Sequence, residues 1–372
     1  MKLFLWIGLL STTSVGFVLQ PAVAASEAPT NGREDAIAKL TALGAKLQRN
    51  EDKHPVAINL FNSSIQDDHL ALLKGLTTVK RLVLGRNKIT DAGLIHLQKL
   101  TQLETLYVPA TLITDAGIPH LHPLVNLKEL GLGRTRVSDA GLKHLSGMKQ
   151  LRVLWLDRTG ITDAGLKHLA GHKHLAQLFL HHTRVSDEGL AHLKNHTRLQ
   201  RLYLPRTRVT DSGLAHLQGL TNLRELGLAN IRLQGDGLRH LAGMSKLQVL
   251  FLGGTMIGDH DLSHLQTLTN LRTLVLGNTH ITDEGLQHLK GHNKLQALFV
   301  PFTSVTDRGV DHLEGLTQLR ELGLEQTLVT DKGLAKVHGM TKLTKLWLGR
   351  TLVSKAGIKR VKTAIPDCRI FE

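Results

Sequence analysis

The sequence predicts an α/β solenoid in which parallel strands line a concave face and short helices cover the convex face. Leucines recur every 24 residues, without insertion or deletion, from Leu103 to Leu343. Each opens a segment with the spacing L-x-x-L-x-L, such as LRVLWL at 151–156, which is typical of a strand that begins each repeat. Because a unit of this size buries its apolar side only against its neighbours, the 372 residues predict one solenoid rather than several domains.

Each repeat, counted from its first leucine, divides into a strand, a turn and a helix. Leucines at positions 1, 4 and 6 point inward and positions 3 and 5 point outward, because side chains alternate along a strand. Position 9 is Thr in ten repeats and is expected to hydrogen-bond the turn and form a ladder. The sequence Ile-Thr-Asp at 161–163 then caps a short helix over 164–170. Gly165 is expected on the inner side of this helix, where a side chain would hold it away from the sheet.

The two ends of the chain differ from the repeats between them. Residues 25–54 are interpreted as an N-terminal helical cap, residues 55–354 as the leucine-rich repeats and residues 355–372 as a C-terminal cap. Within the first cap, residues 33–49 predict an amphipathic helix whose apolar side carries Ile37, Leu40, Leu43 and Leu47. Such caps cover the apolar ends of a solenoid.

Residues 1–24 predict a secretory signal peptide. Lys2 supplies its charge, residues 3–19 its apolar stretch, and Ala-Val-Ala at 22–24 its cleavage site. An uncleaved membrane anchor is the alternative, but a spanning helix needs about 20 apolar residues, and Ser and Thr interrupt this run at 11–14. We expect an exported protein, periplasmic or extracellular, with no membrane span after cleavage. The single cysteine, Cys368, excludes an internal disulfide.

The segment ITDAGLKHL at 161–169 carries a family resemblance. It resembles the ribonuclease-inhibitor-like class of leucine-rich repeats, particularly exported bacterial members with the signature I-T-D-A-G-L-x-H-L. The resemblance extends over residues 33–372. It implies a leucine-rich-repeat solenoid that binds proteins or polymers and does not imply a particular ligand. Thr at position 9 departs from the Asn or Cys found in many relatives.

One outward-facing column is predicted to form the binding surface. Position 5 of successive repeats is Val83, Tyr107, Gly131, Trp155, Phe179, Tyr203, Gly227, Phe251, Val275, Phe299, Gly323 and Trp347. Exposed, aligned aromatic side chains supply rigid contact area for a ligand. The alternative is that the rings only fill a half-buried strand position and stack on one another. We assign ligand binding to Tyr107, Trp155, Phe179, Tyr203, Phe251, Phe299 and Trp347.

Arginines flank this column. They lie at position 8 (Arg86, Arg134, Arg158, Arg206 and Arg350) and at position 10 (Arg136, Arg184, Arg208 and Arg232), and we include Arg134, Arg158 and Arg206 in the predicted binding surface. The formal charge of +15 favours acidic partners, although lysines on the convex helices could serve solubility alone. Aromatic faces edged by arginine suit sugar rings, anionic polymers or a protein partner. Single-stranded nucleic acid would also fit, but export argues against it.

Ten successive repeats carry His at position 18, from His96 to His312. The pairs His168/His172 and His192/His196 have the i,i+4 spacing used by zinc sites, but no Glu accompanies them as in H-E-x-x-H. We interpret the column as structural, with a pH-sensitive surface as the alternative, and predict no metal and no cofactor. No nucleophile elbow, P-loop or dinucleotide fingerprint occurs, so no enzymatic activity is expected.

These features predict a non-catalytic recognition or scaffold protein that binds a protein, or an anionic polysaccharide or other surface polymer, on its concave face. The alternative is a structural spacer of the cell envelope or matrix without a specific ligand. The sequence indicates neither the partner's identity nor the oligomeric state.

Overall fold

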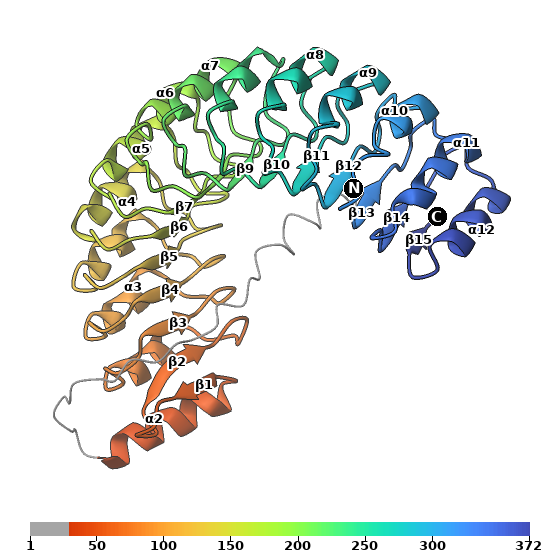
Figure 1. The fold of residues 1–372 in the computed structure, drawn as a ribbon. Coiled ribbons are helices and arrows are strands. Elements are labelled where there is room, and N and C mark those ends of the chain that lie inside the picture. The colour runs from red at the N-terminus through yellow and green to blue at the C-terminus, as the bar shows by residue number, and fades with distance from the viewer. Residues whose placement is uncertain (1–29) are drawn as a thin grey trace.

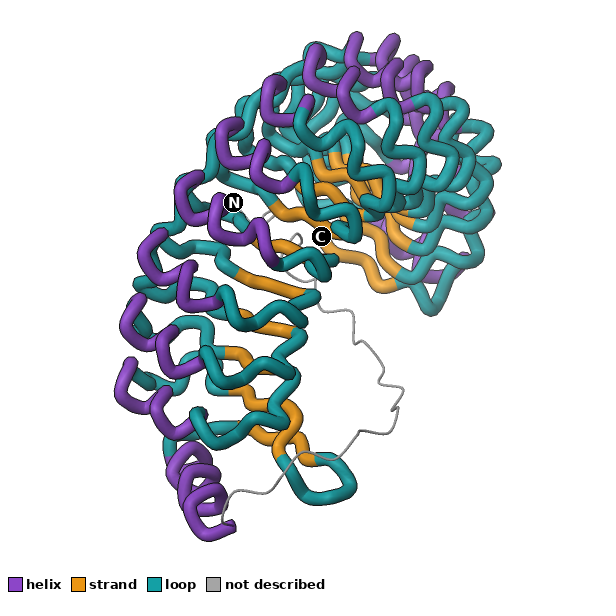
Figure 2. Tube along the Cα trace, turned by 90° about the vertical axis from the view of Figure 1, so that its left-hand side faces the viewer, coloured by secondary structure: helices purple, strands orange, loops and turns teal. Residues whose placement is uncertain are grey.

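The protein forms an arch with strands on its inner side and helices on its outer side (Figure 1). The computed structural model describes residues 30–372, so the predicted signal peptide at 1–24 lies outside the described residues. These residues contain one 15-stranded sheet whose strands follow one another in chain order. Turned by 90°, the tube shows helices along one side, strands along the other, and loops on both flanks (Figure 2). The predicted α/β solenoid is confirmed.

The sheet keeps the 24-residue register throughout its parallel part. For example, Leu154 lies opposite Leu178, and Trp155 lies opposite Phe179. Only the first pair, β1 with β2, is antiparallel. The strands are β1 Lys46–Arg49, β2 Pro55–Asn59, β3 Arg81–Val83, β4 Thr105–Tyr107, β5 Glu129–Gly131, β6 Val153–Trp155, β7 Gln177–Phe179, β8 Arg201–Tyr203, β9 Glu225–Gly227, β10 Val249–Phe251, β11 Thr273–Val275, β12 Ala297–Phe299, β13 Glu321–Gly323, β14 Lys345–Trp347 and β15 Arg369–Phe371.

Short helices cover the convex side, and most begin as one α-turn that tightens into 3-10 geometry. The helix predicted over 164–170 is of this kind, since an α-turn at 163–166 continues as a 3-10 turn at 167–169. The α-helices are α2 Thr30–Ala42, α3 Asp91–Leu94, α4 Asp139–Lys143, α5 Asp163–Leu166, α6 Asp187–Ala191, α7 Asp211–Leu214, α8 Asp259–Leu262, α9 Asp283–Leu286, α10 Asp307–Asp311, α11 Asp331–Leu334 and α12 Lys355–Ala364. The 3-10 helices are η1 Asp67–Leu73, η2 Ile95–Leu97, η3 Asp115–Leu121, η4 His144–Gly147, η5 Lys167–Leu169, η6 Ala215–Leu217, η7 Asp236–Leu241, η8 Ser263–Leu265, η9 Gln287–Leu289 and η10 Ala335–Gly339.

One continuous apolar core runs between the sheet and the helices. Leucines at positions 1, 4 and 6 are fully buried in repeat after repeat, as Leu175, Leu178 and Leu180 are. Ile37 joins this core from α2, and Val361 joins it from α12. Among residues 30–372, no helix has the length and apolarity needed to cross a membrane.

The N-terminal helix is shorter than the sequence predicted. It ends at Ala42, and Leu47 lies on β1 rather than on the helix. Gly44 adopts a φ of 90°, while the N–H groups of Gly44 and Ala45 donate to carbonyls of the last helical turn at 2.9 Å. This is how a glycine ends a helix, and the chain then turns back into the antiparallel strand.

An aspartate at the start of each helix links its repeat to the next one. Asp163 accepts hydrogen bonds from the backbone N–H of Ser186 at 2.7 Å and from its hydroxyl at 2.6 Å. Its carboxylate fills the space that a Cβ at Gly189 would need. The recurring glycine therefore makes room for the preceding repeat's aspartate, which refines the expectation that it brings the helix close to the sheet. The aspartate, predicted only to cap its own helix, bridges two repeats.

Thr at position 9 hydrogen-bonds the turn as expected, but it does not form a ladder. The hydroxyl of Thr135 donates to the carbonyl of Leu132 in the same repeat at 2.6 Å, and Thr183 does the same with Leu180. Asn87, at the same position of an earlier repeat, reaches further, because its amide donates to the carbonyls of Leu60 and Leu84. Each Thr thus closes its own turn.

The aspartate link is interrupted once, between η7 and α8. Position 13 is Gly235 there, and the next repeat carries Asp261 where the others have glycine. A Cβ at Gly235 would clash with the Asp261 carboxylate. Asp261 accepts the N–H of Gly258 at 2.6 Å, so it replaces the missing carboxylate from within its own repeat. Glycine and aspartate have therefore exchanged positions between these two repeats.

A double-mutant cycle tests this exchange. Gly235→Ala should cost about 2–5 kcal/mol, because it adds a clash with Asp261 to a strained φ of 120°. In an Asp261→Gly background the clash is gone, so the same change should cost about 1–3 kcal/mol less. Urea unfolding measures both values. Gly243→Ala, where no atom lies within 4 Å of the added Cβ, is the control. Additive effects would show that the two positions are independent.

Candidate functional site

The predicted aromatic column lies on the concave strands, and its rings contact one another. The Trp155 and Phe179 rings stack with centroids 5.2 Å apart, and Phe179 and Tyr203 stack at 5.1 Å. Val275 separates this set from a second set at the C-terminal end, where the rings of Phe299 and Trp347 lie 5.3 Å apart. The structure therefore brings the predicted residues into two ladders of rings.

The glycine gaps in the column are filled by rings of the preceding strand. A Cβ at Gly227 would lie 2.7 Å from the Tyr203 ring, and one at Gly323 would lie 2.6 Å from the Phe299 ring. Rings two strands apart consequently meet, as Tyr107 and Trp155 do across Gly131, with centroids 4.8 Å apart. The glycines close the ladder instead of interrupting it.

Two of the seven predicted rings are not exposed. Phe179 is 9% exposed, because the rings of both adjacent strands stack on it. Phe251 is 7% exposed and contacts the Tyr203 ring, two strands away. The expectation that all seven side chains are open to a ligand is wrong for these two. Tyr107, Trp155, Tyr203, Phe299 and Trp347 are partly exposed. Their role in binding stays a prediction.

Glutamates beside the gaps anchor the tyrosines. The hydroxyl of Tyr107 donates to Glu129 at 2.7 Å, and that of Tyr203 donates to Glu225 at 2.8 Å. Burial, and then the adjacent carboxylates, raise the pKa of both tyrosine hydroxyls above the usual range, so both stay protonated. These glutamate side chains already accept hydrogen bonds from the protein's own tyrosines.

Phe371 is an aromatic member of the column that the sequence analysis omitted. It lies on β15 opposite Trp347, and the two rings stack at 5.1 Å. The guanidinium of Arg369 lies 4.7 Å from the centre of the Phe371 ring. The 24-residue spacing from Trp347 would have identified it.

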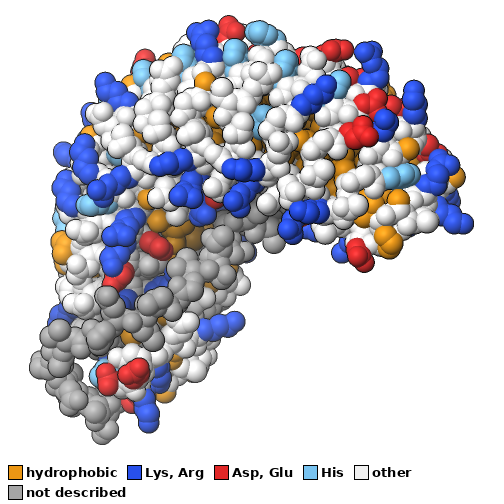
Figure 3. Space-filling model, viewed as in Figure 1, with side chains coloured by type: hydrophobic (Ala, Val, Ile, Leu, Met, Phe, Trp, Pro, Cys, Tyr) orange, Lys and Arg blue, Asp and Glu red, His pale blue; other side chains and the backbone are white. Residues whose placement is uncertain are grey.

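The arginines at positions 8 and 10 lie in the loops that lead from each strand to its helix, and they form two rows along one flank. Arg134, Arg158 and Arg206 are all exposed. Figure 3 shows Lys and Arg side chains spread along the flank of the arch that faces the viewer. Within residues 30–372, seven of these guanidinium groups make no ion pair or side-chain hydrogen bond: Arg86, Arg134, Arg136, Arg184, Arg208, Arg232 and Arg350.

Position 8 has a left-handed backbone throughout the array. The φ angles of Arg134, Arg158 and Arg206 are 58°, 53° and 56°. A left-handed conformation costs a residue with a Cβ on the order of 1–2 kcal/mol, and Gly and Asn tolerate it best. The chain has Asn230, Asn278 and Gly254 at this position in other repeats, so the fold does not require arginine there.

Asp157 and His181 form a polar pair between the ring ladder and the arginine rows. They follow β6 and β7 at position 7, with Asp157 Oδ2 3.4 Å from His181 Nε2. Beside them, His182 Nε2 accepts a hydrogen bond from Arg158 at 3.0 Å. Burial, and then Arg158 and Arg206, lower the pKa of His182 to about 4, so it is neutral near pH 7. The sequence analysis missed this pair, although it departs from the Gly and Pro found at this position elsewhere.

Two groups of histidines differ in how deeply they are buried. Those at position 18 are partly exposed along the convex side, as His168 is. His172, His196 and His292 are buried, and their Nε2 atoms bond carbonyls of the preceding repeat at 3.0–3.1 Å. His172 therefore faces the core and cannot chelate a metal together with His168. No group of three or more potential metal ligands converges anywhere in residues 30–372.

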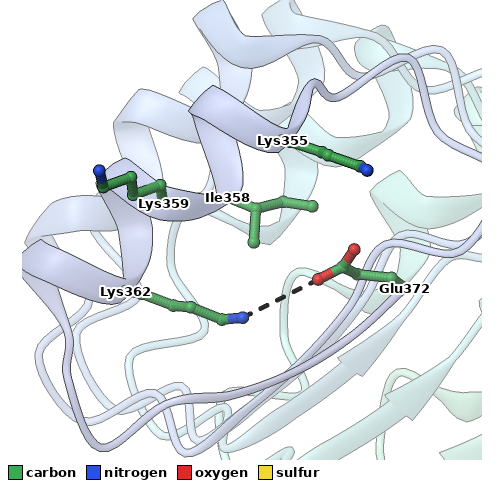
Figure 4. A pocket seen from close by; sticks show the side chains of 5 residues that line it. All are labelled: Lys355, Ile358, Lys359, Lys362 and Glu372. Carbon is green, nitrogen blue, oxygen red and sulfur yellow. Dashed lines mark ion pairs between the residues drawn. The ribbon is translucent and has the colours of Figure 1, made fainter.

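A pocket of roughly 300 Å³ lies at the C-terminal end of the arch (Figure 4). Lys355, Lys359 and Lys362 approach it from α12, and Lys362 Nζ lies 3.9 Å from the Glu372 carboxylate. No Ser, Thr, Cys or His side chain is among the residues that line it. Burial raises the pKa of the Cys368 thiol to about 11, which keeps this sulfur protonated and unreactive.

Comparison with known proteins confirms the class of protein that this fold defines. A leucine-rich-repeat family model matches residues 75–97 and 267–290. The structure is similar to an internalin, InlF, from Listeria monocytogenes, with 22% identity, a TM-score of 0.64, and coverage of 92% of this chain and 94% of that one. It is also similar to a leucine-rich-repeat protein from Leptospira interrogans, with 15% identity, a TM-score of 0.54, and coverage of 82% and 88%. No curated protein matches the chain. The fold is a leucine-rich-repeat solenoid.

Neighbouring substitutions on β7 test the strand register and the ring ladder. Leu178→Ala should cost about 2–5 kcal/mol, because Leu178 is fully buried in the core. Phe179→Ala should cost less than that, yet more than about 1 kcal/mol, because two ring contacts are lost. Chemical unfolding of both variants measures the difference. A larger loss from Phe179→Ala would mean that the ladder, rather than the leucine core, dominates local stability.

Replacing the buried histidines tests whether they remain neutral. Burial lowers the pKa of His172, His196 and His292 below 6.5. Above pH 6.5 both folded and unfolded states are neutral; below it only the unfolded state gains protons, so stability should fall. A triple His→Leu variant, with the residue found at Leu220 and Leu316, should lose less stability between pH 7 and pH 5. Urea unfolding measures this difference. If wild type and the variant lose the same stability between pH 7 and pH 5, other groups cause the acid sensitivity.

Proposed function

We propose that this protein is an exported, non-catalytic recognition module that binds an anionic surface polymer along its arginine rows and the adjacent concave face. Arginine in the left-handed position 8 carries this proposal. Residues held in unfavourable backbone conformations concentrate at functional sites, and the same chain has Asn or Gly at this position in three other repeats.

The charge distribution supports the proposal. Adjacent strands lie about 4.8 Å apart, and each of the five repeats from 127 to 246 carries at least one arginine at position 8 or 10. A polymer that runs along this part of the arch would therefore meet a cation in every repeat. Seven guanidinium groups of the two rows make no ion pair or side-chain hydrogen bond within residues 30–372. Unpaired exposed cations raise the local concentration of an anionic ligand.

We also propose that the protein is exported and that a cap covers each end of the repeats. The predicted signal peptide at 1–24 directs the chain to the periplasm or exterior, and residues 25–54 and 355–372 cap the repeats. Helices on the convex side favour the ribonuclease-inhibitor-like subtype. The alternative is a structural spacer. It is favoured by Phe179 and Phe251, which are buried against other rings of the column rather than exposed to a ligand.

Asparagine substitution separates binding from folding. The Arg134→Asn, Arg158→Asn variant should keep or gain stability, because Asn tolerates the left-handed backbone at both sites. Its binding to inorganic polyphosphate should weaken, and the slope of log K against log salt should fall by about 2. Titration calorimetry at several salt concentrations measures both quantities.

The matched control removes the same charge from the convex side. Lys143→Gln with Lys167→Gln alters two exposed helix residues and should leave the slope unchanged. If wild-type protein does not bind, or if the control weakens binding equally, the arginine rows are not the binding surface and the spacer alternative stands.

A further inference from the structure

The strongest departure from the repeat pattern on the concave face is the pair Asp157 and His181. Position 7 is Gly, Pro or Ala in nine other repeats: Gly85, Pro109, Gly133, Pro205, Ala229, Gly253, Gly277, Pro301 and Gly349. The solenoid therefore folds without a polar side chain at this position. The pair lies near the middle of the array, where β6, β7 and β8 carry three consecutive aromatic rings.

The pair is costly for the fold. The side chain of Asp157 is only 16% exposed, and that of His181 is 27% exposed. His181 Nδ1 is buried without a hydrogen-bond partner among residues 30–372, and a buried polar atom without a partner destabilises the folded state. A ligand that uses the pair would explain why this cost is retained.

Only one oxygen of Asp157 is engaged by the protein. Oδ2 faces His181 Nε2, whereas Oδ1 accepts no hydrogen bond from the described residues. The carboxylate extends over Gly133, which leaves space for it because that residue has no Cβ. Arg134 and Arg158 lie one position further along the same loops. A carboxylate is thus placed inside a row of cations without being neutralised by them.

This arrangement distinguishes among anionic polymers. A polymer that carries only anionic groups gains from the arginines but is repelled by Asp157. A polymer that also carries hydroxyl groups can donate to Asp157 Oδ1, and hydrogen bonds to a charged acceptor are about twice as strong as neutral ones. The Trp155 ring, two residues before Asp157, contacts the rings of Phe179 and Tyr107, and its remaining exposed part offers an apolar contact for a sugar ring.

We propose that Trp155, Asp157 and Arg158 form a subsite for an acidic sugar residue, so that the polymer is a polysaccharide bearing carboxylates. Arg158 pairs with the sugar's carboxylate, Asp157 Oδ1 accepts from its hydroxyl, and the exposed part of Trp155 contacts its ring. This inference rests on the proposed function and narrows its ligand to one class. His181 is a positioning residue that orients the Asp157 carboxylate.

The test compares two polymers on the same protein. Wild type and Asp157→Asn are titrated calorimetrically with an oligomer of polygalacturonate and with inorganic polyphosphate of similar charge. Asp157→Asn preserves the shape of the side chain but removes its charge. It should weaken polygalacturonate binding about tenfold, and it should leave polyphosphate binding unchanged or stronger because a repulsion has been removed. Circular dichroism melting verifies that the variant is folded.

Glu325→Gln is the matched control, since it removes a carboxylate from position 7 at the other end of the array, and it should change neither affinity. If Asp157→Asn binds both polymers with unchanged affinity, or loses the same affinity for both, the subsite is overturned and the proposed function stays intact. Binding of polyphosphate alone by the wild type would overturn it as well. Failure of the wild type to bind either polymer would instead overturn the proposed function.

Discussion

The bond between each helix-initiating aspartate and the next repeat constrains this structure more specifically than its leucine core does. Apolar contact is non-directional, so leucine rows alone would tolerate shifts between repeats. The Asp163 carboxylate instead requires the N–H and hydroxyl of Ser186, 23 residues later, and the missing Cβ of Gly189. These contacts fix the start of one helix relative to the start of the next. The alignment of successive repeats therefore depends on a polar contact as well as on the leucine core.

Much of the fold could be predicted because strand alternation and a fixed period determine which side chains face inward. The aspartate's partner could not, because Asp beside a helix start equally fits a cap for its own helix. Only the exception separates the two interpretations: Gly235 and Asp261 exchange the two residue types between repeats, which makes sense only if the positions touch. The N-terminal helix was predicted too long because apolar spacing continues to Leu47, whereas the chain has already turned at Gly44.

For the concave face, the sequence predicted which side chains share a surface but not how exposed they are. Exposure depends on ring tilt, and the glycines at 131, 227 and 323 allow a ring to lean across a strand and meet the next one. Phe251 makes such a contact with Tyr203, whereas Phe179 is covered by Trp155 and Tyr203 on the adjacent strands. The ladder therefore serves packing first, and the surface left for a ligand is its partly exposed rings together with the polar edge beside them.

At that polar edge, formed by positions 7 and 8 of the repeats, the residues that favour folding differ from those that favour binding. Position 8 needs a left-handed backbone to turn the chain out of its strand, a requirement that Asn230 and Gly254 meet with little strain. Position 7 needs only a small residue, as Gly133 shows. Arg158 and Asp157 satisfy neither preference, yet they adjoin each other beside the Trp155 ring. Two local departures from what folding prefers, on consecutive residues and with opposite charge, are best explained by a ligand that presents both an anion and a hydrogen-bond donor.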